Sequence, residues 1–174
     1  MANQLQPEAY IEFEVYENNT NFLGISSADL PNINFLTQTI TGGGISGNIE
    51  AVLTGMTEAM TLGLHFRSAM DAAVSLMKPE KHNIELRVAE QYWNKTKGAK
   101  EIATDKYVLV VMPKNFAPGS VSPASTPDVS GEYSVYYYAG YKDGKTLWEI
   151  DPWNYKCVIG GKDYMADVRK ALGK

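Results

Sequence analysis

The sequence has few of the residues that metal sites, disulfides and nucleophilic catalysis require. Its 174 residues include one cysteine, Cys157, and two histidines, His65 and His82. A single cysteine excludes an internal disulfide and is typical of a reducing compartment. A zinc site needs several cysteine or histidine ligands at short spacing, which the chain lacks. We therefore expect no metal and no cofactor.

Long apolar runs and an excess of basic charge are also missing. No run approaches the ~18 apolar residues of a membrane span, and the N-terminal segment lacks the basic and apolar regions of a signal peptide. We expect neither membrane insertion nor secretion by a signal peptide. The formal net charge of -4 is unfavourable for a protein whose task is to grip phosphates. The length suits a single domain over residues 1–174.

Candidate chemical sites in the sequence are weak. The glycine spacing of 42–47 matches the dinucleotide fingerprint, but no helix is expected after it, so a mobile β-connection is the better interpretation. Neither histidine lies in a nucleophile signature. Glu149 and Asp151, two apart on one strand, could support acid–base catalysis, although a solvated acidic stripe explains them more simply. We expect a protein that is not an enzyme.

Alternation of apolar and polar side chains predicts a mainly β fold. The expected strands are 10–16, 22–25, 33–41, 48–53, 58–67, 84–89, 107–112, a hairpin over 133–151, and 155–159. A turn is expected at 54–57 and a long proline-rich loop at 113–131. The helical pattern of 68–77, with Ser68 as its cap, predicts a central helix, and 164–172 predicts a short C-terminal one.

The hairpin around Asp143-Gly144 is the strongest local signal. Asp-Gly between two alternating runs favours a two-residue turn with positive φ at both residues. That turn would pair Ala139 with Trp148 and Tyr137 with Ile150, and these residues would share a buried face. The opposite, polar face would then carry Tyr136, Tyr138, Lys142, Lys145, Glu149 and Asp151. The two edges of such a hairpin must be paired or protected, for instance by neighbouring subunits.

The order of features along nearly the whole chain resembles the major tail tube protein of contractile phage tails and R-type bacteriocin tubes. The resemblance rests first on Asn21-Phe22-Leu23-Gly24, Leu30-Pro31 and the glycine-rich segment 42–47. The strand 58–66 and the central helix follow in the expected order. Its most specific part is the C-terminal third, with Tyr141 to Lys145, Glu149-Ile150-Asp151, Ile159 to Asp163 and a basic final helix containing Arg169.

This resemblance implies a β-sandwich or barrel-like tail tube fold and a structural role. Six protomers would form a ring, and rings would stack into a hollow conduit for DNA or ions inside a sheath. The implied partners are further copies of the chain, the tail sheath protein, and the baseplate and tail terminator proteins. DNA would be a partner only in passage through the lumen of a phage tail. The implied location is the bacterial host cytoplasm during assembly, then a virion tail or a released bacteriocin particle.

The resemblance also assigns surfaces. Segments 48–67 and 133–151 would contribute to the wall of the lumen. The residues expected to face the lumen are Tyr138, Lys142, Lys145, Glu149 and Asp151. An acidic wall would let DNA slide, because cationic contacts add affinity for phosphate. The residues expected in inter-subunit or inter-ring loops are Gly42, Gly43, Gly44, Gly47, Pro118 and Pro123.

Two other functions stay open at this point. One is a secreted hexameric ring protein of the type VI secretion class, which resembles the same broad fold. The other is a small-ligand or hydrolytic domain that uses His65 or the pair Glu149 and Asp151. The sequence does not separate a phage tube from a bacteriocin tube.

Overall fold

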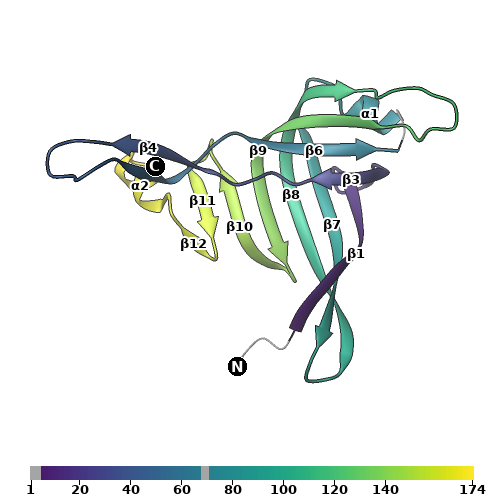
Figure 1. Ribbon diagram of the computed structural model, residues 1–174, viewed down its shortest axis with the longest axis horizontal. Coiled ribbons are helices and arrows are strands. Elements are labelled where there is room, and N and C mark those ends of the chain that lie inside the picture. Colours follow the sequence, from purple (N-terminus) through teal and green to yellow (C-terminus); the bar gives the residue numbers. More distant parts are fainter. Residues whose placement is uncertain (1–4, 68–70) are drawn as a thin grey trace.

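The structure, a computed structural model, describes residues 5–67 and 71–174 and consists mostly of antiparallel strands (Figure 1). The strands are β1 (Leu5–Glu17), β2 (Asn21–Phe22), β3 (Ile25–Asp29), β4 (Phe35–Ile40), β5 (Ile49–Thr57), β6 (Met60–Phe66), β7 (His82–Asn94), β8 (Ala99–Ala117), β9 (Val129–Lys142), β10 (Lys145–Asp151), β11 (Lys156–Ile159) and β12 (Lys162–Asp163). The helices are α1 (Asp71–Ser75) and α2 (Ala166–Ala171). The expected mainly β fold with a central and a C-terminal helix is confirmed.

One sheet runs in the order β12-β11-β10-β9-β8-β7-β1-β2, and β6 and β3 branch from it. The branch arises because β9 divides one edge between two partners. Residues 129–135 of β9 pair with β6, whereas 138–142 pair with β10. In Figure 1 β6 and β3 run across the long strands, so the upper part of the sheet folds over into a second layer. Strands β4 and β5 form a separate two-stranded ribbon.

The sheet is open. Its ends are β12 and the short β2, which pairs with β1 at Tyr16 and Glu17 alone. Over the described residues no strand joins these ends, so the chain by itself is a folded-over sheet and not a closed barrel.

The hydrophobic core joins β6 to the upper parts of β7, β8 and β9. Along β6 the residues Met60 to Phe66 alternate between buried and half-buried, as period two predicts. Burial of these apolar side chains is the main term that holds the second layer on the first. The core members from the facing strands include Ile84, Leu86, Leu109, Val111, Val129, Tyr133 and Tyr138.

Two boundaries differ from the sequence prediction. Strand β5 continues through 54–57, where a turn was expected, and the chain breaks only at 58–59. Strand β8 extends to Ala117 and includes Pro113, so the loop between β8 and β9 spans 118–128 instead of 113–131. Pro113 is tolerated because β7 ends its pairing with β8 at Val111, which leaves the β7 side of β8 without a ladder that needs an N–H.

The central helix is shorter than expected. Helix α1 covers Asp71–Ser75, and the predicted cap Ser68 lies outside the described residues. Ala73 and Leu76 are buried in the core, as the helical stripe predicts, but Met77 is exposed.

The Asp143-Gly144 turn forms, but the predicted register holds only for the two pairs nearest to it. A bulge at Leu147 then places Trp148 opposite Gly140 and Ile150 opposite Tyr138, one residue away from the predicted pairing. The bulge lets the Trp148 indole lie over Gly140, where a β-carbon would overlap the ring. Local turn chemistry alone cannot reveal this insertion, because a packed indole decides it.

A second inserted residue, Tyr136, lies where β9 changes partners, since Val110 pairs with Tyr137 and Val111 with Val135. Each inserted residue reverses the alternation of side chains along a strand. Tyr138 therefore faces the core and is 2% exposed. The prediction that Tyr138 lies on the polar face of the hairpin is wrong.

Candidate functional site

One face of the sheet carries charged and tyrosine side chains in register across neighbouring strands. Directly opposed residues share a face, and the rows run from Glu14 through Arg87 and Lys106 to Tyr141, with Tyr16 and Glu85 in the next row. We call this the paired-charge face. Its members are Glu14, Tyr16, Glu85, Arg87, Lys106, Tyr137, Tyr141, Glu149, Asp151 and Lys156.

The charges on the paired-charge face are largely compensated. Glu85, which is 3% exposed, accepts bonds from Arg87 Nε at 2.6 Å and Lys106 Nζ at 2.9 Å. Burial raises the pKa of Glu85, but the hydrogen bonds from Lys106 and Arg87 outweigh burial and leave that pKa below its ordinary value. Glu149 accepts from Lys156 at 2.8 Å and from the Tyr137 hydroxyl at 3.1 Å. The face thus balances four carboxylates against three cations.

The opposite face carries a second polar cluster below the core. Lys142 donates to Glu90 at 2.9 Å and to the Tyr92 hydroxyl, and it lies 3.8 Å from Asp105. Hydrogen bonds to Glu90 and Tyr92 raise the pKa of Lys142. Burial raises the pKa of Asp105. The Lys142 charge opposes this shift and the Glu90 charge adds to it, so the pKa of Asp105 lies above its ordinary value.

The residues predicted to face a lumen are therefore divided. Glu149 and Asp151 lie on the paired-charge face, and Asp151 also binds Asn154 in the following turn. Lys142 lies on the opposite face, where it binds Glu90. Lys145 lies directly across the turn from Lys142 in the strand register. A surface that contains all of them does not exist in the folded chain.

Sequence reasoning missed Glu85, Arg87 and Lys106. The alternation of 84–89 predicted the strand but not the ionic partners of its polar positions. Lys106 meets Glu85 only because β7 and β8 pair as long neighbours. Opposite charges at alternate positions of consecutive predicted strands are the signal that could have found them.

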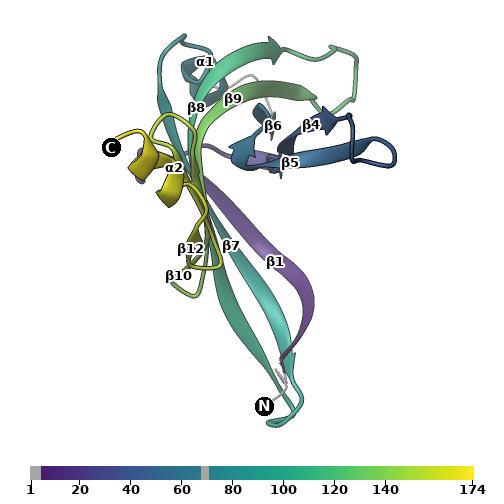
Figure 2. The same cartoon turned by 90° about the vertical axis from the view of Figure 1, so that its left-hand side faces the viewer.

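The ribbon β4–β5 and its tip project away from the sheet, and we call residues 35–57 the arm (Figures 1 and 2). Its tip contains Gly42, Gly43, Gly44 and Gly47, and positive φ at Gly44 and Gly47 suits the residue type. Glu50 is the single charged residue of the arm. Exposed apolar side chains along it are Ile40, Ile49, Val52 and Met56.

The loop 118–128, with Pro118 and Pro123 exposed, joins β8 to β9 beside α1, at the other end of the view in Figure 1 from the arm. No contact of this loop or of the arm tip assigns either to a ring or sheath interface, so their predicted role stays a prediction.

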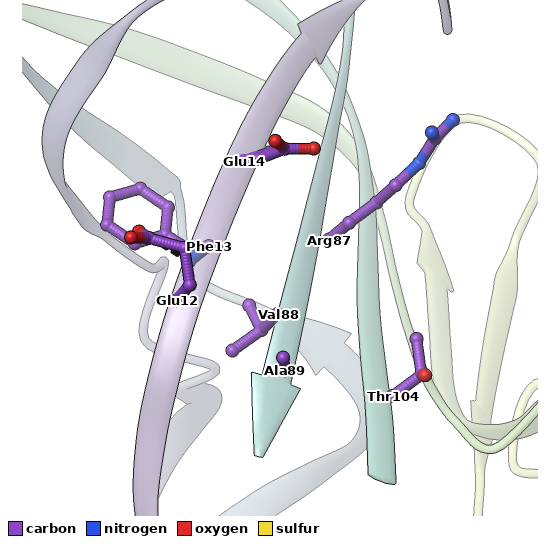
Figure 3. A pocket seen from close by; sticks show the side chains of 7 residues that line it. All are labelled: Glu12, Phe13, Glu14, Arg87, Val88, Ala89 and Thr104. Atoms are coloured by element: carbon purple, nitrogen blue, oxygen red, sulfur yellow. Dashed lines mark hydrogen bonds between the residues drawn. The ribbon is translucent and has the colours of Figure 1, made fainter. Parts of the chain in front are cut away.

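A cleft of about 210 Å³ lies at a bulge in β1 (Figure 3). Glu14 and Arg87 point to one side of the sheet there, and Phe13 and Val88 to the other. The cleft thus mixes two faces of a sheet and presents no nucleophile beside a base.

The histidines have structural partners. His65 Nε2 lies 3.1 Å from Asp29 Oδ2 on the surface. His82 is buried, with Nδ1 at 2.6 Å from Glu17 Oε1 and Nε2 at 3.1 Å from the Lys78 carbonyl. Burial raises the pKa of the Cys157 thiol, which makes it a poor nucleophile.

Two features are absent from the described residues. In 5–67 and 71–174 no group of three or more His, Cys, Asp or Glu residues could hold a metal ion. No helix among the same residues is long and apolar enough to cross a membrane.

An open antiparallel sheet, with a projecting arm that has one charged residue and a face whose charges are largely compensated, defines a β-sheet protein suited to assembly. Residues 7–173 match the family of phage tail tube protein FII, and the chain belongs to that family. It is a structural protein of a tail tube.

One solved structure agrees with this family at the level of the fold, and two further structures have a lower similarity. A chain of the extended sheath–tube complex of PVC, an extracellular contractile injection system, has a TM-score of 0.50 and 13% identity, covering 75% of this chain and 86% of that one. A chain of the PVC sheath/tube terminator has a TM-score of 0.47 and 14% identity, covering 74% of this chain and 91% of that one. A chain of the anti-feeding prophage baseplate has a TM-score of 0.45 and 10% identity, covering 82% of this chain and 97% of that one. No curated protein sequence matches this chain.

Proposed function

We propose that this tube protein forms rings of six copies, which stack in one direction into a hollow conduit inside a contractile sheath. The observation that carries the proposal is the open sheet, because its unpaired edge on β1 and its projecting arm both need cover from another chain. A contact that joins two different surfaces of each copy can close into a ring, and a second such contact along the axis makes a filament.

The arm supports assembly on energetic grounds. The base of the arm packs at Gly55 against Met165, but farther out the arm is a two-stranded ribbon, which by itself is marginally stable in water. There it exposes Ile40, Ile49 and Val52 and has almost no charge to keep it soluble. Burial against a neighbouring copy would stabilise it. We propose that the arm, with Gly42, Gly43, Gly44 and Gly47 at its tip, contacts an adjacent protomer or ring.

We propose that the paired-charge face lines the lumen, with Glu149 and Asp151 retained from the sequence prediction. The opposite face is covered by core and the folded-over β6 layer, so it suits a water-filled bore less well. Arg87 and Lys106 are both held by Glu85. Cations that are already paired add little affinity for phosphate, which would let a passing nucleic acid slide.

We propose a structural role without catalysis. The partners would be the sheath, baseplate and terminator proteins, as expected from the family, and DNA or ions would only pass through the bore. The particle would assemble in the host cytoplasm and be released as a virion tail or a bacteriocin.

Negative-stain microscopy of the purified chain tests the assembly. Long hollow tubes with six-fold rings are the expected result. Isolated rings that never stack would favour the type VI class, and a stable monomer at high concentration would contradict the proposal.

The contribution of the arm can be tested separately. Ile40→Ser with Ile49→Ser should raise the concentration needed for assembly by about a hundredfold or more, since about 1.5 kcal/mol or more is lost for each of the two large apolar side chains that fail to be buried. The monomer should unfold as the unmodified chain does. Val74→Ser, at an exposed valine of α1, is the matched control. Equal effects of both variants on assembly would show that the arm does not lie in the interface.

A further inference from the structure

The outer edge of β1 is long and unpaired. From Leu5 to Glu14 the strand has its hydrogen-bonding neighbour β7 on one side, and β2 covers the other side only from Tyr16 onward. The Phe13 amide, which points to the free side, is bound by the Glu12 carboxylate at 3.0 Å. Tyr10 is 65% exposed and Ile11 is 55% exposed. An edge with exposed apolar side chains and free backbone groups is built to be covered.

This edge is purely acidic. Residues 5–17 contain four glutamates and no cation. Glu17 is engaged with the buried His82, and Glu14 accepts the Tyr16 hydroxyl. Glu8 and Glu12 are exposed and form no ion pair with any described residue.

The other end of the sheet has the opposite charge. Residues 156–174 hold five cations and two carboxylates, a net charge of +3. Arg169 is bound by Asp163, and Lys156 by Glu149. The remaining cations, Lys162, Lys170 and Lys174, are exposed without an ion pair among the described residues. Lys162 lies over the Tyr164 ring and Lys174 over Tyr155, which holds two of these charges at this end.

The two ends lie on opposite sides of the molecule. In Figure 1 β1 is on the right, whereas β12 and α2 are on the left. Both ends of one copy can therefore be occupied at once by two different neighbours.

We infer that the free edge of β1 in one copy packs against the β12–α2 end of the next copy, with Glu8 and Glu12 facing Lys162 and Lys170. This inference rests on the proposed ring and names the surfaces that join its members. The contact is heterologous, because each copy offers a different surface to each neighbour, so it closes into a ring when the rotation permits. Pairing of two β1 edges is opposed, because their glutamates would face each other.

Charge exchange between the two ends tests this contact. The acidic-end variant is Glu8→Lys with Glu12→Lys, and the basic-end variant is Lys162→Glu with Lys170→Glu. A third chain combines all four substitutions. The control is Glu80→Lys with Lys81→Glu, two exposed residues in the segment that joins α1 to β7. It keeps the net charge and lies outside both the β1 edge and the β12–α2 end.

Each two-site variant alone should need about a tenfold higher concentration to assemble, because like charges then meet at every contact. An equimolar mixture of the two variants should assemble again, since copies that alternate around an even-numbered ring such as a hexamer oppose unlike charges at every contact. The chain with all four substitutions should also assemble. The measurements are sedimentation velocity and negative-stain microscopy at low ionic strength, with circular dichroism to confirm that each monomer is folded.

Other outcomes contradict the contact in distinguishable ways. If the unmodified chain forms tubes and the two-site variants behave like the Glu80/Lys81 control, the assigned surfaces are wrong while the proposed function stands. The same conclusion holds if neither the mixture nor the four-site chain assembles at a lower concentration than either two-site variant alone. If the unmodified chain forms neither rings nor tubes, the proposed function and this contact fail together.

Discussion

At the scale of single residues, Gly140 and Trp148 decide the register of the hairpin. The indole of Trp148 stacks on Tyr107 with ring centroids 6.0 Å apart and meets Tyr138 edge-on at 5.4 Å. This aromatic group needs the surface above Gly140 to be free of a side chain. A one-residue insertion at Leu147 is the backbone adjustment that allows it.

We predict that Gly140→Ala lowers the free energy of unfolding by about 1–3 kcal/mol, because the new methyl group overlaps the ring and forces repacking. Urea denaturation followed by tryptophan fluorescence measures the change. Gly43→Ala, where a β-carbon meets no atom, should cost less than about 0.5 kcal/mol. Equal costs at both positions would show that the ring does not depend on Gly140.

A second residue-scale feature is the buried pair of His82 and Glu17. The Lys78 carbonyl can only accept, so Nε2 carries a proton, and the 2.6 Å contact between Nδ1 and Glu17 requires another proton between them. The pair connects the end of the α1 segment to β1 and β7 in the core.

We predict that His82→Leu destabilises the fold by about 3–5 kcal/mol, because it leaves the Glu17 carboxylate buried without a partner. Adding Glu17→Met should recover at least about 1 kcal/mol, since the stranded charge is then removed as well. Thermal and urea unfolding of the two variants provide the comparison. His65→Leu, which loses an exposed pair with Asp29, should cost less than about 1 kcal/mol. A double variant less stable than His82→Leu would contradict this account.

At the scale of elements, the β9–β10 hairpin combines a predictable turn with an unpredictable strand. Asp143 and Gly144 have φ of 46° and 77°, the left-handed values that the Asp-Gly signal predicts. The Asp143 carboxylate also accepts the Thr104 amide at 3.1 Å, and the Asp143 amide donates to the Thr104 carbonyl at 2.9 Å. The turn is therefore attached to the edge of β8 as well as to its own strands.

We predict that Asp143→Val with Gly144→Val abolishes tube assembly while some folded monomer remains. Two β-branched residues would each have to occupy positive φ, at about 1–3 kcal/mol per residue, and the bond to Thr104 would be lost. Asp143→Asn keeps an oxygen acceptor and tolerates positive φ, so it should assemble normally. Negative-stain microscopy and circular dichroism distinguish the two. Normal tubes from the valine pair would show that this turn does not shape the wall.

The elements also show how far the sequence leads. Period two along 60–66, the turn at Asp143-Gly144 and the helical stripe through Ala73 and Leu76 are local signals, and each is confirmed. The bulges at Leu147 and Tyr136 are not local, since they follow from Trp148 packing and from the change of partner along β9. For that reason Tyr138 was assigned to the wrong face. Pro113 predicts a loop because proline has no N–H to donate to a neighbouring strand. It is accepted within β8 because β7 has already ended at that point.

At the scale of the whole molecule, several buried tyrosines couple stability to alkaline pH. Burial raises the pKa of Tyr133 from 10.0 to about 12. Burial also raises the pKa values of Tyr107, Tyr137 and Tyr138. Between pH 10 and the higher folded pKa values the unfolded chain loses these phenol protons first, so it binds fewer protons than the folded chain. Stability is therefore complete below pH 10 and falls as pH rises above it.

We predict that the free energy of unfolding declines above about pH 10 by about 1.4 kcal/mol per pH unit for each such tyrosine. Urea denaturation at increasing pH measures the slope. Tyr133→Phe removes one titrating group and should reduce the slope by that amount. A slope independent of Tyr133 would show that its phenol ionises equally in both states.

The sequence by itself determined that this chain is mainly β and where its strongest turn lies, because these depend on short-range periodicity and turn chemistry. Its order of features also resembles that of a tail tube protein. The tertiary structure alone decided which side chains share a face. The inserted residue Leu147 separates Tyr138 from Glu149, and the long pairing of β7 with β8 brings Lys106 to Glu85. Side-chain direction in a sheet reverses with every inserted residue, so it depends on packing between distant strands that no local pattern records.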